Sequence, residues 1–358
     1  MDRRNYGAYR QYLKKPSINK RKERTGISRE RIPLTPENIL LLILPLLLLL
    51  IIVPPPNEMA NKIVEEPVES SVEAVSISVF NINDSLIDMV DLEEYLVGVV
   101  AAEMPHTYNE EALKAQAVAA RTFAVSRARG LYGTFAEHFG ADVCTDPGHC
   151  QGWISNEEFI ESGGNEEAWQ KVANAVANTK NIVMTYAGGL INPLYHSNSG
   201  GATENIEAVW SNLGEVPYLK SVYSPDESMY NEFEKSTVFT WDEIKKKVKN
   251  KYPKVEFTND PAQDLEVISY NSSGRIEKIR LGSVEITGTE FRELLKLRST
   301  NLELKLTDEN TVEIISKGFG HGVGMSQCGA DALAKKGYTY KEILEFFYTG
   351  IAVEELMH

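Results

Sequence analysis

The longest apolar run of the chain, from Ile39 to Val53, lies near its N-terminus, and Pro45 is the one helix breaker in it. A helix of fifteen residues is about 22 Å long, somewhat short of the roughly 30 Å hydrocarbon core of a bilayer. A cleaved secretory signal is therefore one interpretation. The basic region upstream is longer than a usual signal n-region, however, and no small-x-small cleavage site precedes Pro54-Pro55-Pro56. We favour an uncleaved transmembrane signal anchor over residues 39–56.

Charge predicts how this anchor is oriented. The first 38 residues hold eleven basic and four acidic residues, a net charge of +7, whereas the remaining 320 hold 26 and 47, a net charge of −21. Basic residues stay on the cytoplasmic side of a membrane. We therefore expect a basic cytoplasmic segment over residues 1–38, a polar linker over 57–75 and an extracytoplasmic domain over 76–358 at the cell membrane. So acidic a domain would repel phosphates, which excludes nucleic acid as a partner.

Helical patterns dominate the first part of this domain. Leu92, Leu96 and Val99 mark one face of a helix that Asp91 caps and Pro105 ends. A second helix follows over 109–130, and its mostly alanine face allows a neighbouring element to approach closely. Further helices are predicted over residues 166–178, 241–250, 288–295, 326–336 and 340–348.

Alternating apolar and polar residues predict strands over 76–80, 182–186, 265–270, 276–281, 302–306 and 312–316. Most of them fall after about residue 217. The whole pattern predicts an α+β fold in two lobes, with helices around Glu103 in the first lobe and a strand-rich second lobe over roughly 217–316.

Glu103 continues the apolar stripe of the first predicted helix, four residues after Val99. Burial and the negative end of the helix dipole both raise the pKa of a carboxyl in such a place. A raised pKa is what a general acid needs at neutral pH. The alternative is that Glu103, at the end of the helix, simply reaches solvent, and the spacing alone does not choose between the two.

A loop rich in glycine and aspartate carries His138, Cys144 and Cys150, with His149 next to the last. Two thiolates and an imidazole could supply three of the four ligands of a tetrahedral zinc site, although the spacing matches no common zinc-finger rule. Because an extracytoplasmic domain permits disulfides, a Cys144–Cys150 bridge is the rival interpretation. The third cysteine, Cys328, has no role that the sequence indicates.

Two further loops are rich in small and polar residues. The first, Tyr195 to Gly201, follows a strand and could approach a sugar closely or be an ordinary turn. The second, Gly318 to Gln327, fits neither phosphate-binding glycine pattern and leads into a helix. Its glycines would let the backbone pass close to a ligand or a neighbouring strand.

These segments together resemble the stage II sporulation protein D family. The resemblance rests on five motifs in the family's order, Glu94–Pro105, Ala112–Ala124, Cys144–Trp153, His196–Gly201 and Gly320–Gln327, and extends over roughly residues 75 to 350 plus the anchor. The family comprises membrane-anchored lytic transglycosylases of endospore formers. They degrade peptidoglycan during engulfment and prefer glycan strands stripped of stem peptides.

The resemblance implies a role for particular residues. Glu103 would be the catalytic acid, and His138, Cys144 and Cys150 would bind zinc near the cleft, with His149 as a competing ligand. The candidate substrate-binding residues are Tyr195, His196, Ser197, Ser199, His321 and Gln327. The resemblance also implies the partners: peptidoglycan glycan strands, the amidase called stage II sporulation protein P, and stage II sporulation protein M.

The chemistry agrees with this resemblance. Ordinary glycosidases need two carboxylates, and the sequence places only one on a convincing helix stripe. A lytic transglycosylase needs one, because the C6 hydroxyl of the substrate's muramic acid replaces water and gives a 1,6-anhydro product. The competing hypothesis is a glycan-binding enhancer of cell-wall amidases without bond cleavage, because related proteins share much of this domain.

Overall fold

The computed structural model of the protein describes residues 75–132, 136–258 and 260–356. The predicted cytoplasmic segment, signal anchor and almost all of the linker lie outside these residues. Within them, no helix combines the length and the apolar character that crossing a bilayer would take. The domain mixes helices and small sheets, as the sequence pattern predicts.

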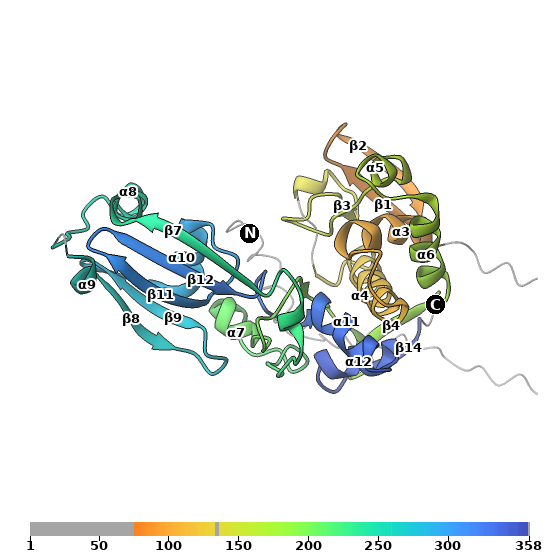
Figure 1. The fold of residues 1–358 in the computed structure, drawn as a ribbon. Helices are drawn as coiled ribbons and strands as arrows, with labels where there is room; N and C mark the ends of the chain where they lie inside the picture. The colour runs from red at the N-terminus through yellow and green to blue at the C-terminus, as the bar shows by residue number, and fades with distance from the viewer. Residues whose placement is uncertain (1–74, 133–135, 259, 357–358) are drawn as a thin grey trace, which may run out of the picture. The chain divides into compact units, whose positions relative to one another are not determined.

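Helix α4 (Glu110–Ala128) lies at the centre of the larger hydrophobic core, with α3 (Leu92–Glu103) and α6 (Glu166–Ala177) packed against it (Figure 1). The C-terminal helices α11 (Gln327–Lys335) and α12 (Tyr340–Phe347) also contact α4. Fourteen consecutive or near-consecutive positions of α4 are buried, and six of these are alanines, whose small side chains let four helices approach one helix.

Small sheets complete this core. Strands β2 (Leu86–Asp91), β1 (Ser76–Asn81) and β3 (Val143–Cys144) form one, in that order, and β14 (Ala352–Glu355), β4 (Ile182–Tyr186) and β5 (Gly189–Leu190) form another. The short strands β6 (Tyr195–His196) and β13 (Met325–Ser326) pair in parallel, which joins the two predicted polar loops side by side.

The strand-rich part has its own hydrophobic cluster, which extends from Trp241 to Ile314. Two antiparallel sheets surround it, one of β11 (Asn301–Asp308), β12 (Thr311–Lys317) and β7 (Glu234–Thr240), the other of β10 (Val284–Thr287), β9 (Ile276–Leu281) and β8 (Leu265–Tyr270). Helices α8 (Trp241–Lys251) and α10 (Gly288–Leu295) pack with them, and α9 (Pro261–Asp264) precedes β8. This part begins at β7, later than residue 217, because Tyr218 and Leu219 pack in the larger core.

A buried ion pair fixes the position of α3. The fully buried Arg121 of α4 donates two hydrogen bonds to Glu93 in the first turn of α3, from Nε to Oε1 at 2.8 Å and from Nη2 to Oε2 at 2.7 Å. The same guanidinium donates to the carbonyl oxygens of Val176 and Ile182. Because Glu93 and Glu103 lie on one helix, this network also positions the predicted catalytic acid.

Several elements have no counterpart in the prediction from sequence: β2, β7, β10, β14 and α5 (Asn156–Glu161). β7 shows the reason. Its first four residues are polar and it is largely exposed, so it lacks the buried alternation by which strands are recognised. Short 3₁₀ helices and a four-residue helix, α7 (Ile206–Val209), fill the connection between β6 and β7.

Candidate active site and metal centre

A pocket of about 350 Å³ lies at the C-terminal end of α3. Its lining includes Glu103, the polar loop after β5, the loop before β13 and part of the His138–Cys150 loop. The lining residues are Glu103, Phe123, Pro147, Cys150, Gln151, Pro193, Leu194, Tyr195, His196, Ser197, Phe319, Gly320, His321 and Gln327. Glu103 is the only acid among them. Five of the six residues predicted to bind substrate line the same pocket as Glu103.

Glu103 stands in a setting that favours its protonated form. Burial raises the pKa of its carboxyl, and hydrogen bonds from the backbone of Gly152 and the side chain of Gln327 partly offset that rise. The N–H of Gly152 donates to Glu103 Oε1 at 2.6 Å. Of the two interpretations of Glu103 that the sequence leaves open, the structure favours the buried carboxyl over the solvent-exposed one.

Polar residues surround this carboxyl. Tyr195 donates from its hydroxyl to Gln151 Oε1 at 3.0 Å, and Gln327 donates to Gln116 Oε1 at 3.4 Å. Gln116 and Gln151 are almost completely buried, and the amide nitrogen of each has no hydrogen-bond partner within the described part of the chain. No sequence pattern marks either glutamine, because each stands among ordinary helix or loop residues.

Two histidines form another part of the wall. Burial lowers the pKa of His196 well below its ordinary value and that of His321 to about 3, so both rings are neutral at physiological pH. His196 Nδ1 is 3.2 Å from the carbonyl oxygen of Val323 and must carry the proton, which leaves Nε2 as an acceptor. His196 is 5% exposed, and its Nε2 has no partner within the described residues.

Ser199 differs from the prediction. It is fully buried and does not line the pocket, because its backbone N–H and its hydroxyl both donate to the carboxylate of Glu227. Its position within a loop of substrate-binding candidates suggested otherwise, but the part of the loop that lines the pocket ends at Ser197, and Asn198 and Ser199 are buried behind it. Glu227, which the sequence analysis does not identify, therefore anchors this loop from behind.

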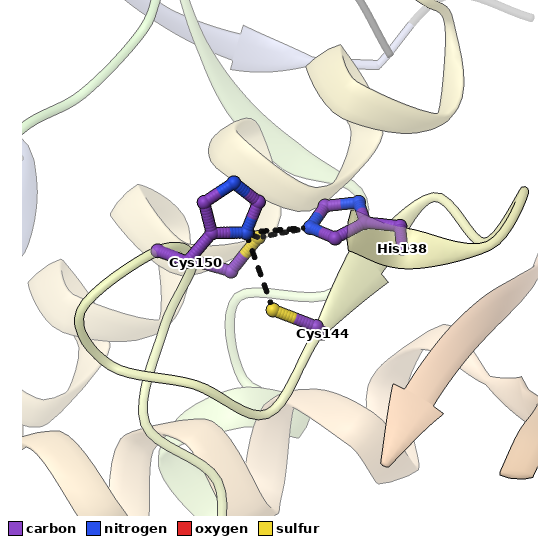
Figure 2. Close-up of side chains that lie close together, drawn as sticks. His138, Cys144 and Cys150 are labelled. Carbon is purple, nitrogen blue, oxygen red and sulfur yellow. Dashed lines mark hydrogen bonds between the residues drawn. The ribbon is translucent and has the colours of Figure 1, made fainter. Parts of the chain in front are cut away.

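The side chains of His138, Cys144 and Cys150 turn toward one another (Figure 2). His149 joins them, and the four ligand atoms all lie within 4.8 Å of one another. His138 Nε2 is 2.8 Å from His149 Nδ1 and 3.3 Å from Cys150 Sγ, and Cys144 Sγ is 3.4 Å from His149 Nδ1. The two histidines thus occupy the same cluster instead of competing, and both cysteines are free thiols.

The nitrogen–sulfur distances suit a four-coordinate metal. Metal–sulfur bonds of about 2.3 Å and metal–nitrogen bonds of about 2.0–2.1 Å give tetrahedral edges of roughly 3.3–3.8 Å. The 3.3 and 3.4 Å distances fall in this range, whereas the two histidine nitrogens, 2.8 Å apart, would have to separate when a metal binds. The Cys150 thiol, followed by His138 and His149, lowers the pKa of the Cys144 thiol to about 3, which favours the thiolate that binds metals. Two sulfurs and two nitrogens would fill a tetrahedral site completely.

The cluster is coupled to the pocket through the chain that follows it. Cys150 and Gln151 line the pocket, and Gly152 donates to Glu103. Two residues later, the N–H of Ile154 donates a hydrogen bond to the carbonyl oxygen of Gly98 on α3. A Cβ atom on Gly98 would lie only 2.3 Å from Trp153 Nε1. Only glycine allows this approach, so the loop that carries the four ligands is held against the helix that carries the acid.

The fold and site define a mixed helix-and-strand protein whose cleft has a single carboxyl among its lining residues and lies beside a two-histidine, two-cysteine cluster. A family model described as "Stage II sporulation protein" matches residues 83–186. Stage II sporulation protein D of Bacillus subtilis is 34% identical over 284 residues, 78% of this chain and 79% of that protein. The same protein of Bacillus amyloliquefaciens is 33% identical over 289 residues, 78% of this chain and 79% of that one.

The chain belongs to the stage II sporulation protein D family, as its sequence motifs predict. It is also similar to a protein named amidase enhancer from Bacillus subtilis, which is 28% identical over 304 residues, 71% of this chain and 39% of that protein.

Proposed function

We propose that this protein is a lytic transglycosylase that cleaves peptidoglycan glycan strands, with Glu103 as its catalytic acid. The observation that carries the proposal is the single half-buried carboxyl in a pocket whose other lining residues include no acid. Glycoside hydrolysis by water ordinarily requires two carboxyl groups. A reaction in which the substrate supplies its own nucleophile requires one.

In this reaction Glu103 acts twice. Its proton, which burial retains on the carboxyl, passes to the glycosidic oxygen between N-acetylmuramic acid and N-acetylglucosamine as that bond breaks. The resulting carboxylate, stabilised by the Gly152 N–H and the Gln327 amide, then accepts the proton of the muramic acid C6 hydroxyl as its oxygen bonds to C1. The product carries a 1,6-anhydro end, and Glu103 is protonated again.

Zinc is the proposed cofactor, held by His138, Cys144, His149 and Cys150. When bound, it supplies a cross-link within the loop and no Lewis-acid chemistry, since four protein ligands leave no open position. The loop would then be held at the cleft, where Cys150 and Gln151 line the wall and the N–H of Gly152 donates a hydrogen bond to the Glu103 carboxyl.

The proposed setting is the outer face of the cell membrane in a sporulating cell, with the chain anchored once by residues 39–56. Engulfment during endospore formation would be the process served. Stage II sporulation protein P would first remove stem peptides from the wall, and stage II sporulation protein M would be a further membrane partner. The acidity of the domain supports this order, because stem peptides add negative charges to the wall.

The second candidate is a glycan-binding enhancer of an amidase, which the similarity to the protein of that name favours. Both functions use the cleft to bind glycan. Only the transglycosylase needs a proton on Glu103, so this residue separates the two.

The deciding experiment compares the full-length chain with its Glu103→Gln variant on glycan strands stripped of stem peptides. Glutamine keeps the size of the side chain and removes the acid, so cleavage should fall by about 10²–10⁴-fold while glycan binding persists. Mass analysis of the ends is the measurement: anhydro ends indicate C6 attack, and reducing ends indicate hydrolysis. Anhydro ends at the parent rate from the variant would exclude Glu103. A parent protein that forms no new ends but accelerates an amidase would establish the enhancer function.

A further inference from the structure

One wall of the cleft is built from three chain segments that backbone hydrogen bonds hold in register. Asn198 and Phe319 exchange two of them, at 3.0 and 2.8 Å, and the N–H of Gly320 donates to the carbonyl of Arg298 at 3.0 Å. Gly320 also lies against His196, whose Cβ would be 2.7 Å from a Cβ at that position. We call the pocket-lining residues His196, Ser197, Phe319 and His321, together with Arg298, which stacks on Phe319 without lining the pocket itself, the Phe319 wall. Its members are fixed relative to one another before any ligand arrives.

Phe319 presents an aromatic ring to the cleft. It lines the pocket and is 42% exposed, an unusual state for a phenylalanine. The glycines on both sides of it, with φ of 84° and 116°, let the backbone turn the ring outward while it stays paired with Asn198. An exposed ring of this kind suits the apolar face of a pyranose.

Arg298 places a positive charge at the edge of this ring. Its guanidinium carbon is 5.1 Å from the centroid of Phe319, and Nη1 is 3.5 Å from the carbonyl oxygen of Asn231. Among the described residues it forms no ion pair, although residues 39–358 carry a net charge of −21. A guanidinium that stacks on an aromatic ring keeps its planar donors available for two-point binding of a carboxylate.

The wall therefore combines three kinds of contact. His196 Nε2 is a buried acceptor without a partner in the described structure, and it can accept a hydrogen bond from water or from a ligand hydroxyl. Phe319 offers an apolar surface, and Arg298 offers a cation. N-acetylglucosamine has the hydroxyls and the apolar ring face but no charge. N-acetylmuramic acid has both and, on its lactyl ether, a carboxyl group that is ionised unless a stem peptide is attached to it through an amide.

We propose that the Phe319 wall is a subsite for N-acetylmuramic acid with a free lactyl carboxylate, and that Arg298 binds this carboxylate. The inference rests on the proposed function in taking peptidoglycan glycan as the ligand of the cleft. Because the two sugars alternate along a strand, a subsite that accepts only one of them sets which glycosidic bond lies at Glu103. The same contact is lost when a stem peptide converts the carboxylate into an amide.

The test measures binding to the full-length chain carrying Glu103→Gln, so that no ligand is cleaved during the measurement. Three ligands are compared: glycan strands with free lactyl carboxylates, the same strands with the carboxylates converted to primary amides, and chitin tetrasaccharide, which has no lactyl group. Free carboxylates should tighten binding about fivefold over the amides, the size expected for a half-exposed ion pair. Adding Arg298→Gln should abolish this difference and leave the chitin affinity unchanged.

Arg280→Gln is the control for net charge, because Arg280 lies on β9, is paired with Glu266 and does not contact Phe319. Equal affinity of the parent for free and amidated strands would overturn the inference, and that comparison needs no variant of Arg298 to fold. A parallel loss of affinity for all three ligands in Arg298→Gln would also overturn it, since this would indicate a structural role. Failure of the parent to bind any of the glycans would refute the proposed function itself, which is a distinguishable result.

Discussion

Replacing Glu93 with glutamine tests whether the buried ion pair with Arg121 holds α3 in place. Arg121 has no exposed side-chain surface, and its other hydrogen bonds go to neutral oxygens of Val176, Thr179 and Ile182. Glu93→Gln therefore leaves a buried guanidinium without an opposite charge. Breaking a buried pair from one side costs about 3–5 kcal/mol. Because the Glu93 side chain is 22% exposed and glutamine still accepts one hydrogen bond, we expect the lower end, about 3 kcal/mol.

The assay is urea unfolding of the full-length chain, followed by tryptophan fluorescence, with Glu94→Gln as the control. Glu94 is the next residue of the same helical turn and is exposed, so its replacement removes the same charge and should change the free energy of unfolding by less than about 0.5 kcal/mol. The folded Glu93→Gln protein should also cleave glycan more slowly, since α3 carries Glu103. A loss below about 1 kcal/mol would show that solvent or the backbone carbonyls satisfy Arg121, and that the pair does not position α3.

Three further predictions follow from the site and from the proposed setting. Gln327→Met removes a hydrogen bond that lowers the pKa of Glu103, so this pKa should rise and the alkaline limb of the pH–kcat profile should move to higher pH. An alkaline limb that stays in place or moves to lower pH would contradict the contact. The purified chain should contain close to one zinc ion per molecule, and chelation should make Cys144 and Cys150 titratable; metal-free protein with a Cys144–Cys150 disulfide would exclude the ligand set. External protease on intact protoplasts should digest residues 57–358 and leave the segment before Ile39 protected, whereas protection of the large fragment would reverse the proposed orientation.

The sequence predicts those parts of the fold in which local signals and burial agree. Asp91 caps α3 as its side chain suggests, since it accepts hydrogen bonds from the N–H groups of Glu93 and Glu94. The strands β8 and β9 and the helix α10 have the predicted bounds, because each alternates or repeats apolar residues between clear turn residues. β7 is missed because β12 pairs with it and stabilises residues that have little strand pattern of their own, and β10 because its alternation extends over only four residues.

The site is predictable in its chemistry and less so in its geometry. Glu103 and the His–Cys loop stand out by residue type, and the structure brings them to one cleft. What the sequence does not reveal is which side of a loop faces inward. Ser197 lines the cleft whereas Ser199 binds Glu227, and nothing in the intervening residues distinguishes them. The partners of buried side chains, such as Glu227, come from distant segments and leave no local pattern.

The pairing of strands has a consequence for when the protein becomes active. Tyr195 of β6 lines the cleft and pairs with Met325 of β13, and β4 of the same core pairs with β14, so both strands depend on residues that follow far along the chain. A chain that leaves the ribosome N-terminus first has α3 and Glu103 complete long before these partners emerge. Until β13 follows, the loop that begins at Tyr195 lacks its neighbour, and the cleft does not exist. The order of synthesis thus delays the assembly of the site until β13 has been made.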